Sequence, residues 1–120
     1  IDSSLNKICF FLKFNNNCYN KSYESTKNNY DQFSVLLFAF LRENNINLDK
    51  IGHLFVNHGP GNFSGIRISI ATAKGLAITN KLDLYGFNSN DLKNMNYLEI
   101  IDLYDKGKLK KNLIKPHYLS

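Results

Sequence analysis

The chain has 120 residues, of which 43% are hydrophobic and 21% charged, and its formal net charge is +5. This length gives room for one domain with one compact core, and the proportions are those of a soluble globular protein. The longest apolar run covers residues 35–41, far short of the roughly 20 residues that cross a bilayer. The first residues have neither the basic start nor the apolar stretch of a signal peptide. We therefore expect a cytoplasmic protein without membrane contacts, whose charge favours an anionic partner.

The residue types that most often bind metals are few and poorly placed for that role. Cys9 and Cys18 have no His or Cys at metal-ligand spacing, so we expect two buried or half-buried free thiols. His53 and His58 lie five residues apart on a predicted strand, where their side chains point to opposite faces. We expect one core and one surface histidine, and the sequence predicts no metal site, no cofactor and no catalytic residues.

In chain order, the sequence predicts a hairpin followed by alternating strands and helices. Residues 1–4 end a strand and enter a polar turn, and the missing initiator Met indicates processing or a trimmed start. Asn29 and Gln32 form a capping-box pattern for the first helix, and Ser89 or Asn90 caps the last. The further strands are predicted at 7–14, 18–25, 51–58 and 82–87, and the helices at about 30–43, at 63–78 and up to 95. Residues 97–104 fit a strand or a helix, and a basic connection follows at 106–115.

The resulting order, β-β-β-α-β-α-β-α, indicates an α/β fold class. A hairpin followed by strand–helix alternation implies a mixed sheet with helices packed on it. This is the order of the ribonuclease-H-like half-domain that actin-like ATPases use twice.

Three glycines, Gly59, Gly61 and Gly65, lie between a predicted strand and the start of a helix. Glycines there permit a positive φ and a close backbone approach, and the free N–H groups of a helix start can bind phosphate. The functional interpretation is a nucleotide phosphate loop, to which Asp2, Ser3 and Ser4 could add a site for a hydrated cation. The alternative is a tight turn that lets helix and sheet pack closely. The spacing fits neither the Rossmann nor the Walker A pattern.

The two long predicted helices are more apolar than one buried face requires. In the helix at 63–78, small residues recur every fourth position, at Gly65, Ser69, Ala73 and Ala77. Beside them lies an apolar ridge of Ile66, Ile70 and Ile78, which Lys74 interrupts. Arg67 and Lys74 face solvent or a polar partner. In the helix at 30–43, one face is formed by Phe33, Leu37, Phe40 and Leu41, and residues 35, 36, 38 and 39 cover much of the rest. A helix that is apolar nearly all round is buried on more than one side, which favours a protein–protein interface over a cover supplied by the chain itself.

Several segments resemble one known family. Residues 58–68, HGPGNFSGIRI, and 71–77, ATAKGLA, resemble the signature G-P-G-S-F-T-G-x-R-x-G…A-T-A-K-G-L-A of the TsaB (YeaZ) family. Residues 1–4, IDSS, resemble that family's opening I-D-T-S, and residues 84–92 resemble its V-G-V-S-S-L-E segment. Residues 116–119, PHYL, are similar to its closing P-x-Y-L.

The resemblance implies a non-catalytic member of the actin-like ATPase superfamily. TsaB proteins are regarded as paralogues of TsaD that pair with TsaD, and with TsaE in bacteria, to form N6-threonylcarbamoyladenosine (t6A) beside the anticodon of tRNA. TsaD itself has an H-x-x-x-H metal motif after its G-P-G helix, and nothing after Ala77 supplies it here. The expected function is therefore a partner that binds and activates TsaD. The alternative is a nucleotide-binding enzyme acting through Asp2 and the loop at 59–65.

The resemblance also implies a surface and a domain division. The family's dimer interface is built from two helices that correspond to residues 30–43 and 63–78. The expected partner-binding residues are Phe33, Leu37, Phe40, Leu41, Gly65, Ile66, Arg67, Ser69, Ile70, Ala73, Lys74 and Ala77. A homodimer through the same helices is a further expectation. We expect residues 1–96 to form a ribonuclease-H-like N-lobe, residues 97–120 to form a short extension in place of the family's second lobe, and any phosphate loop to be vestigial.

Overall fold

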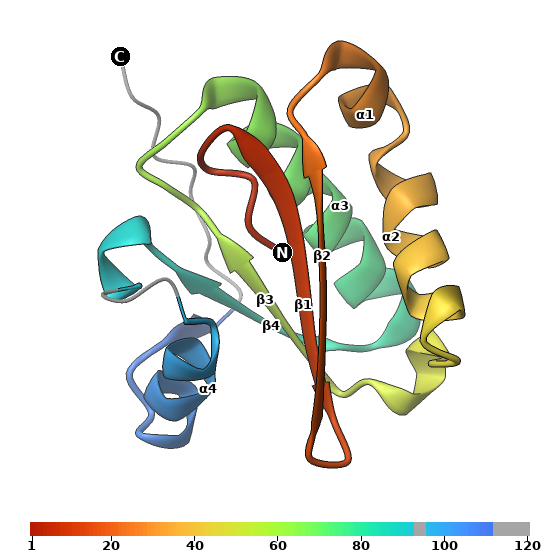
Figure 1. The fold of residues 1–120 in the computed structure, drawn as a ribbon. Coiled ribbons are helices and arrows are strands. Elements are labelled where there is room, and N and C mark those ends of the chain that lie inside the picture. Colours follow the sequence, from red (N-terminus) through yellow and green to blue (C-terminus); the bar gives the residue numbers. More distant parts are fainter. Residues whose placement is uncertain (93–95, 112–120) are drawn as a thin grey trace.

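The structure is a computed structural model that describes residues 1–92 and 96–111 (Figure 1). Strands β1 (Lys7–Phe14) and β2 (Asn17–Glu24) form an antiparallel hairpin. Strands β3 (His53–Asn57) and β4 (Asp83–Phe87) pair in parallel, and the short β5 (Lys110–Lys111) pairs antiparallel with β4. Parallel and antiparallel pairs thus occur together, as the sequence predicts.

Four helices accompany the strands in the described residues. They are α1 (Lys27–Asp31), α2 (Phe33–Glu43), α3 (Phe63–Asn80) and α4 (Leu98–Asp105), with 3-10 turns at Leu48–Lys50 and Ser89–Asp91. Figure 1 shows α2 and α3 side by side, with α4 apart from them beside β3 and β4. No helix within the described ranges is long and apolar enough to span a membrane.

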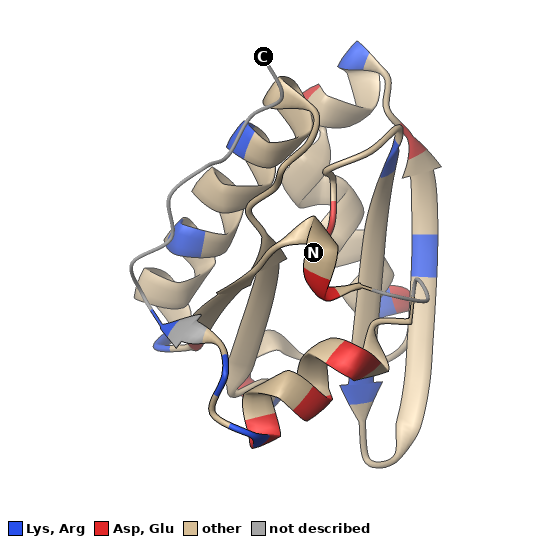
Figure 2. Ribbon diagram, turned by 90° about the vertical axis from the view of Figure 1, so that its left-hand side faces the viewer, with Lys and Arg blue, Asp and Glu red and all other residues tan. Residues whose placement is uncertain are grey.

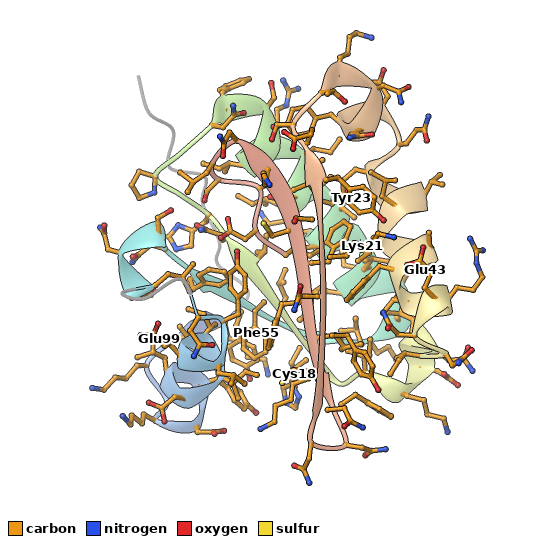
Figure 3. All side chains as sticks on the ribbon, viewed as in Figure 1. Cys18, Lys21, Tyr23, Glu43, Phe55 and Glu99 are labelled. Atoms are coloured by element: carbon orange, nitrogen blue, oxygen red, sulfur yellow. The ribbon has the colours of Figure 1, made fainter. Side chains whose placement is uncertain are left out.

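The hairpin follows directly from its sequence. Asn15 and Asn16 have φ of 50° and 66°, the left-handed region that a two-residue turn needs and that Asn tolerates. The turn fixes Phe14 opposite Asn17, and the register then turns Ile8 and Phe10 into the core. On the outer strand, Lys21 reaches Glu43 of α2, with Nζ and a carboxylate oxygen 3.0 Å apart (Figure 3).

The N-terminal residues connect the hairpin to the parallel strands. Asp2 exchanges two backbone hydrogen bonds with Cys9 of β1, at 3.0 and 2.8 Å. Ile1 donates its amino group to the Phe55 carbonyl oxygen at 2.8 Å and accepts from the Asn57 N–H at 3.0 Å. The predicted strand end is therefore present as a two-residue segment, held between β1 and β3.

The two faces of the strands are covered by different helices. Phe10 contacts the rings of Phe33 and Phe40 on α2, with centroids 5.5 and 5.9 Å apart. The next residue, Phe11, points to the opposite face, where its ring centroid lies 5.7 Å from that of Tyr97, just before α4. A second core joins α3 to β3 and β4; its buried members are Val56, Ile66, Ile70, Ala73 and Leu84.

Several element boundaries differ from the prediction. The capping residue near the first predicted helix is Thr26, which accepts from the Asn29 N–H, and the helix is divided at Gln32 into α1 and α2. Asn88 caps the turn at Ser89–Asp91 because its side chain and that of Asp91 form a reciprocal capping box. The ambiguous segment at 97–104 is helical, as α4. Residues 93–95, 112–115 and the closing 116–119 lie outside the described residues.

The cysteine and histidine predictions are correct in part. Cys9 and Cys18 are free thiols, with Cys9 half-buried as expected, but Cys18 is exposed on the outer strand. His53 is exposed, and His58 is half-buried. Within residues 1–92 and 96–111, no three His, Cys, Asp or Glu side chains lie together as metal ligands would.

Candidate functional site

A buried polar cluster surrounds Asp2 at the junction of the sheet. Its Oδ1 accepts from the Ser4 N–H at 3.0 Å and from the Ser4 hydroxyl at 2.7 Å, and it also accepts from the Asn57 amide at 3.1 Å. Its Oδ2 accepts from the Tyr97 hydroxyl at 2.8 Å. Both oxygens of this carboxylate, which is only 6% exposed, are therefore engaged by the chain itself.

Asn57 extends the cluster to the glycine loop. Its Nδ2 also donates to the hydroxyls of Ser4 and Ser89, at 3.0 and 3.2 Å, and its Oδ1 accepts from the Gly59 N–H at 2.8 Å. Gly59 has φ 110°, a conformation that L side chains rarely adopt. The Ser89 hydroxyl donates to the Pro60 carbonyl oxygen at 2.9 Å. The loop conformation is thus fixed by side chains from β3 and from the turn after β4.

The other two glycines are required by close backbone packing. A Cβ atom at Gly61 would overlap the carbonyl of Ser4, and one at Gly65 would overlap the carbonyl of Ser3. The Asn62 N–H donates to the Ser4 carbonyl at 2.7 Å, and the Asn62 side chain caps α3 by accepting from the Gly65 N–H at 2.9 Å. The N–H groups of Asn62 and Gly65 and the space beside Gly61 and Gly65 are occupied by this chain, and this close packing favours the tight-turn interpretation.

Burial shifts the pKa of three groups in and beside the cluster, Ile1, Tyr97 and Cys9, so that their neutral forms are favoured. Burial lowers the pKa of the Ile1 amino group to about 6, against an opposing effect of the nearby Asp2 carboxylate. Burial, and then the negative charge of Asp2, raises the pKa of the Tyr97 hydroxyl. Burial also raises the pKa of the Cys9 thiol. The raised pKa values favour the protonated forms of Tyr97 and Cys9, in which the Tyr97 hydroxyl can donate to Asp2.

The structure places most of the predicted partner-binding residues in the interior. On α2, the side chains of Phe33, Leu37, Phe40 and Leu41 are all buried against β1. On α3, Gly65, Ile66, Ser69, Ile70 and Ala73 are buried, Ala77 is half-buried, and Arg67 and Lys74 are exposed. These side chains pack against the chain's own sheet, and their part in binding a partner stays a prediction.

The opposite sides of the same two helices form a second apolar surface. Val35 and Phe38 of α2 are 61% and 42% exposed, and Ile78 of α3 is 82% exposed. Between the helices runs an open groove, and its lining consists of Ser34, Phe38, Leu48, Ala71, Thr72, Gly75, Leu76, Thr79 and Asn80. We refer to this surface, with Val35 and Ile78, as the outer face. The sequence indicated that residues 35 and 38 are apolar, but it did not predict the groove. The groove depends on how α2 and α3 pack together, and the two sides of an apolar helix look alike in sequence.

An aromatic cluster at the other end of the sheet was not predicted. The rings of His53, Phe55, Tyr85 and Tyr104 lie with centroids 4.9 to 6.2 Å apart. The Tyr104 hydroxyl lies 2.8 Å from Nε2 of His53. Alternation along β3 and the period of α4 are the signals that could have placed these rings together. Their mutual packing attaches α4 to the sheet.

Two comparisons of the sequence with known proteins agree. Residues 24–97, more than half of the chain, match the model of the family described as "TsaD: tRNA N6-adenosine threonylcarbamoyltransferase". The chain is also 30% identical over 77 residues to the tRNA threonylcarbamoyladenosine biosynthesis protein TsaB of Buchnera aphidicola subsp. Baizongia pistaciae. The chain belongs to the family of that model, in its TsaB (YeaZ) branch.

Solved structures confirm the predicted fold class. YeaZ from Pseudomonas aeruginosa matches with a TM-score of 0.69 and 20% identity, over 88% of this chain and 47% of that chain. A crystal structure of an uncharacterized protein with similarity to peptidase YEAZ, also from Pseudomonas aeruginosa, matches equally well. The chain thus has the α/β, ribonuclease-H-like fold of YeaZ. It spans 47% of these structures, and the alignment with the Buchnera TsaB covers 64% of this chain and 35% of that relative.

Proposed function

We propose that this TsaB-family chain acts in t6A formation as a non-catalytic partner that binds and activates a TsaD homologue. The observation that supports this proposal is the outer face of α2 and α3. Its apolar side chains Val35, Phe38 and Ile78 are exposed to solvent in the described structure. The opposite sides of the same two helices are buried in the core.

The composition of the outer face suits a partner helix. Single exposed apolar residues are ordinary on protein surfaces, but here Phe38 lines a groove between α2 and α3, and Val35 and Ile78 are exposed on the same two helices. Ala71 and Gly75 on its α3 side are small, and the position of a Cβ on Gly75 has no neighbour within 4 Å. Small residues allow another helix to approach closely, as in ridge-into-groove packing.

Charges border the same surface. Arg67 and Lys74 are exposed on α3, and Figure 2 shows the basic positions along this helix. A partner with acidic residues beside an apolar helix would therefore gain orientation from α3. TsaE and tRNA would meet this chain only indirectly, in the cytoplasm, and a homodimer would compete for the same outer face.

The polar cluster supports the part of this proposal that makes the chain non-catalytic. The carboxylate of Asp2 is engaged on both oxygens, and the carbonyls of Ser3 and Ser4 fill the space beside Gly65 and Gly61. The alternative, a nucleotide-binding enzyme acting through Asp2 and the loop at 59–65, would need these contacts to open. We also retain the proposal that residues 1–96 form the N-lobe and that residues 97–120 extend it.

The test is a titration of the 120-residue chain with a purified TsaD homologue from the same source, followed by calorimetry or sedimentation. Saturable binding with a defined stoichiometry, and more t6A formed in its presence, would support the proposal. A second titration with ATP and Mg²⁺ alone tests the alternative. Stoichiometric nucleotide binding without any binding to the TsaD homologue would contradict the partner function.

A further inference from the structure

Strand β2 is the outer strand of the hairpin, and only its inner side is paired. Figure 2 shows the hairpin at the right-hand margin of the molecule, with β2 outside β1. Because Cys9 directs its backbone N–H and C=O away from β2, to Asp2, its partner Ser22 directs the same groups away from β1. Strand alternation gives Cys18 and Asn20 the same outward direction. In residues 1–92 and 96–111, no backbone hydrogen bond engages the outward groups of Cys18, Asn20 and Ser22.

The next outward residue, Glu24, ends this open edge. Its carbonyl oxygen accepts from the Thr26 N–H and from the Asn29 side-chain amide, both at 2.9 Å. The unpaired part of the strand therefore spans residues 18–22, and we call it the β2 edge.

The β2 edge lacks the features that usually keep strand edges apart, which are prolines, bulges and outward-pointing charges. Residues 17–24 contain no proline, and their register with β1 runs from end to end without a bulge. Lys21 is the only cation of the strand, and its Nζ is held 3.0 Å from a carboxylate oxygen of Glu43 on α2. The exposed side chains on either side of it, those of Cys18, Asn20 and Ser22, are small and uncharged. The edge is thus open to another strand.

The β2 edge is complementary to itself in one antiparallel register. Centred on Asn20, this register sets Asn20 opposite Asn20 of a second copy and Cys18 opposite Ser22, so that all the unpaired outward groups are used. A register centred on Lys21 would set like charges opposite each other and would use the occupied end at Glu24. A register centred on Tyr19 would set Ser22 opposite residue 16, which has φ of 66° in the hairpin turn. The register about Asn20 is therefore preferred.

The side chains agree with this register. Tyr19 lies opposite Lys21 of the second copy, on the face turned to α2, and no like charges meet between residues 17 and 23. The Nζ of Lys21 already lies 5.5 Å from the ring centroid of Tyr23 in its own chain. A second copy would bring the Tyr19 ring to the same cation, and such cross-strand pairs stabilise a sheet. On the other face, the two Asn20 amides can bond to each other.

We propose that the β2 edge is a homodimerisation site, at which two copies of this chain pair antiparallel about Asn20 and join their hairpins into one continuous sheet. The occupant is a second copy, because β2 itself supplies the strand whose backbone and charges fit. The interface is small, so the dimer is weak, with a Kd of about 10 µM or higher. The β2 edge shares no residue with the outer face, and this inference does not depend on the proposed function.

The experiment is a charge exchange at the centre of the proposed dimer. Sedimentation equilibrium compares the parent chain with Asn20→Lys and Asn20→Glu, from about 10 µM to 1 mM, the range expected for a small interface. A reducing agent prevents disulfides between the exposed Cys18 thiols. We expect each variant alone to weaken dimerisation by tenfold or more, because like charges meet at the two-fold axis, and a one-to-one mixture of the two to regain it. Position 20 is exposed, so neither substitution disturbs the core.

Hydrogen exchange locates the contact within the dimer. The amides of Cys18, Asn20 and Ser22 should exchange more slowly as the concentration rises. Those of Tyr19 and Lys21, which already bond to β1, are the internal control. A parent chain that stays monomeric up to 1 mM would overturn the proposal, and a mixture that dimerises no better than either variant would overturn the register about Asn20.

Phe38→Glu is the control for a homodimer through the outer face. We expect this variant to dimerise like the parent chain, because Phe38 lies in the groove between α2 and α3 and not on β2. A dimer that Phe38→Glu abolishes and that both Asn20 variants leave intact would assign self-association to the outer face and overturn the proposal.

Discussion

The hydroxyl of Tyr97 donates to Oδ2 of Asp2 at 2.8 Å and so joins the start of the chain to the residue that precedes α4. The two residues are 95 positions apart. Ser4 and Asn57 donate to Oδ1 of Asp2, and Tyr97 donates to Oδ2. Without this donor, the buried carboxylate would have one hydrogen bond fewer to offset the cost of its burial. The contact therefore couples the position of α4 to the integrity of the polar cluster.

Tyr97→Phe is expected to lower the free energy of unfolding by about 1 to 3 kcal/mol, the cost of leaving a buried carboxylate oxygen without its donor. The ring contact with Phe11 is retained in this variant, so the effect reports the hydroxyl. Urea denaturation gives the measurement. The control is Tyr104→Phe, whose hydroxyl faces the exposed His53 and should matter by less than about 0.5 kcal/mol. Equal effects of the two variants would disprove the special role of Tyr97.

Two glycines of α3 should respond in opposite directions to the same substitution. Gly65→Ala places a methyl group on the Ser3 carbonyl, and we expect a loss of about 2 kcal/mol or more of unfolding free energy. Gly75→Ala meets open space in the same helix and should stabilise the protein by roughly 0.5 to 1 kcal/mol. Thermal unfolding of both variants beside the parent chain checks the pair. Tolerance of Ala at position 65 would show that the close packing of α3 on Ser3 is incorrect.

In a chain that begins at Ile1, stability should depend on pH through the amino group of this residue. The pKa of this group is about 6 in the folded chain, against 8.0 for an ordinary amino terminus. Between these values the unfolded chain binds the proton more strongly, so the free energy of unfolding rises from pH 6 to pH 8. A shift of that size corresponds to a rise of about 2 to 3 kcal/mol over this window, and no further loss from this group occurs below pH 6.

Chemical denaturation at several pH values measures this dependence, and an N-acetylated chain is the matched control. Acetylation removes the charge while the amide N–H can still donate to the Phe55 carbonyl. Since the two proteins share every other ionisable group, the difference between the two curves isolates the amino group. Parallel curves would mean that the group is solvated in the folded state.

Much of the fold follows from local sequence signals. The Asn pair at the hairpin, the glycines before α3 and the strand compositions predict these elements because each depends on nearby residues. The boundary at Thr26 was missed because Asn29 offers an equally good cap in sequence, and β5 was missed because a two-residue strand carries no periodicity. The contact between Tyr97 and Asp2 depends on tertiary packing alone, so no local pattern could reveal it.

The candidate surface shows a different limit. Periodicity correctly indicated that α2 and α3 are apolar on more than one side, but it could not tell which side meets the sheet. The residues with the strongest pattern, such as Phe33 and Ile66, are the ones that the chain itself buries. Weaker positions, such as Phe38 and Ile78, remain exposed. In α2 and α3, the most regular apolar ridge therefore lies in the core.

The most direct test of the partner function compares the affinity of a TsaD homologue for the parent chain with its affinity for Phe38→Glu and for Glu99→Lys. Phe38 lines the groove of the outer face, whereas Glu99 lies on α4, outside it. We predict that Phe38→Glu weakens binding by tenfold or more, about 1.4 kcal/mol, since a buried charge at the interface has no partner, and that Glu99→Lys binds like the parent chain. Unchanged affinity of a folded Phe38→Glu variant, or equal weakening by both substitutions, would contradict the account.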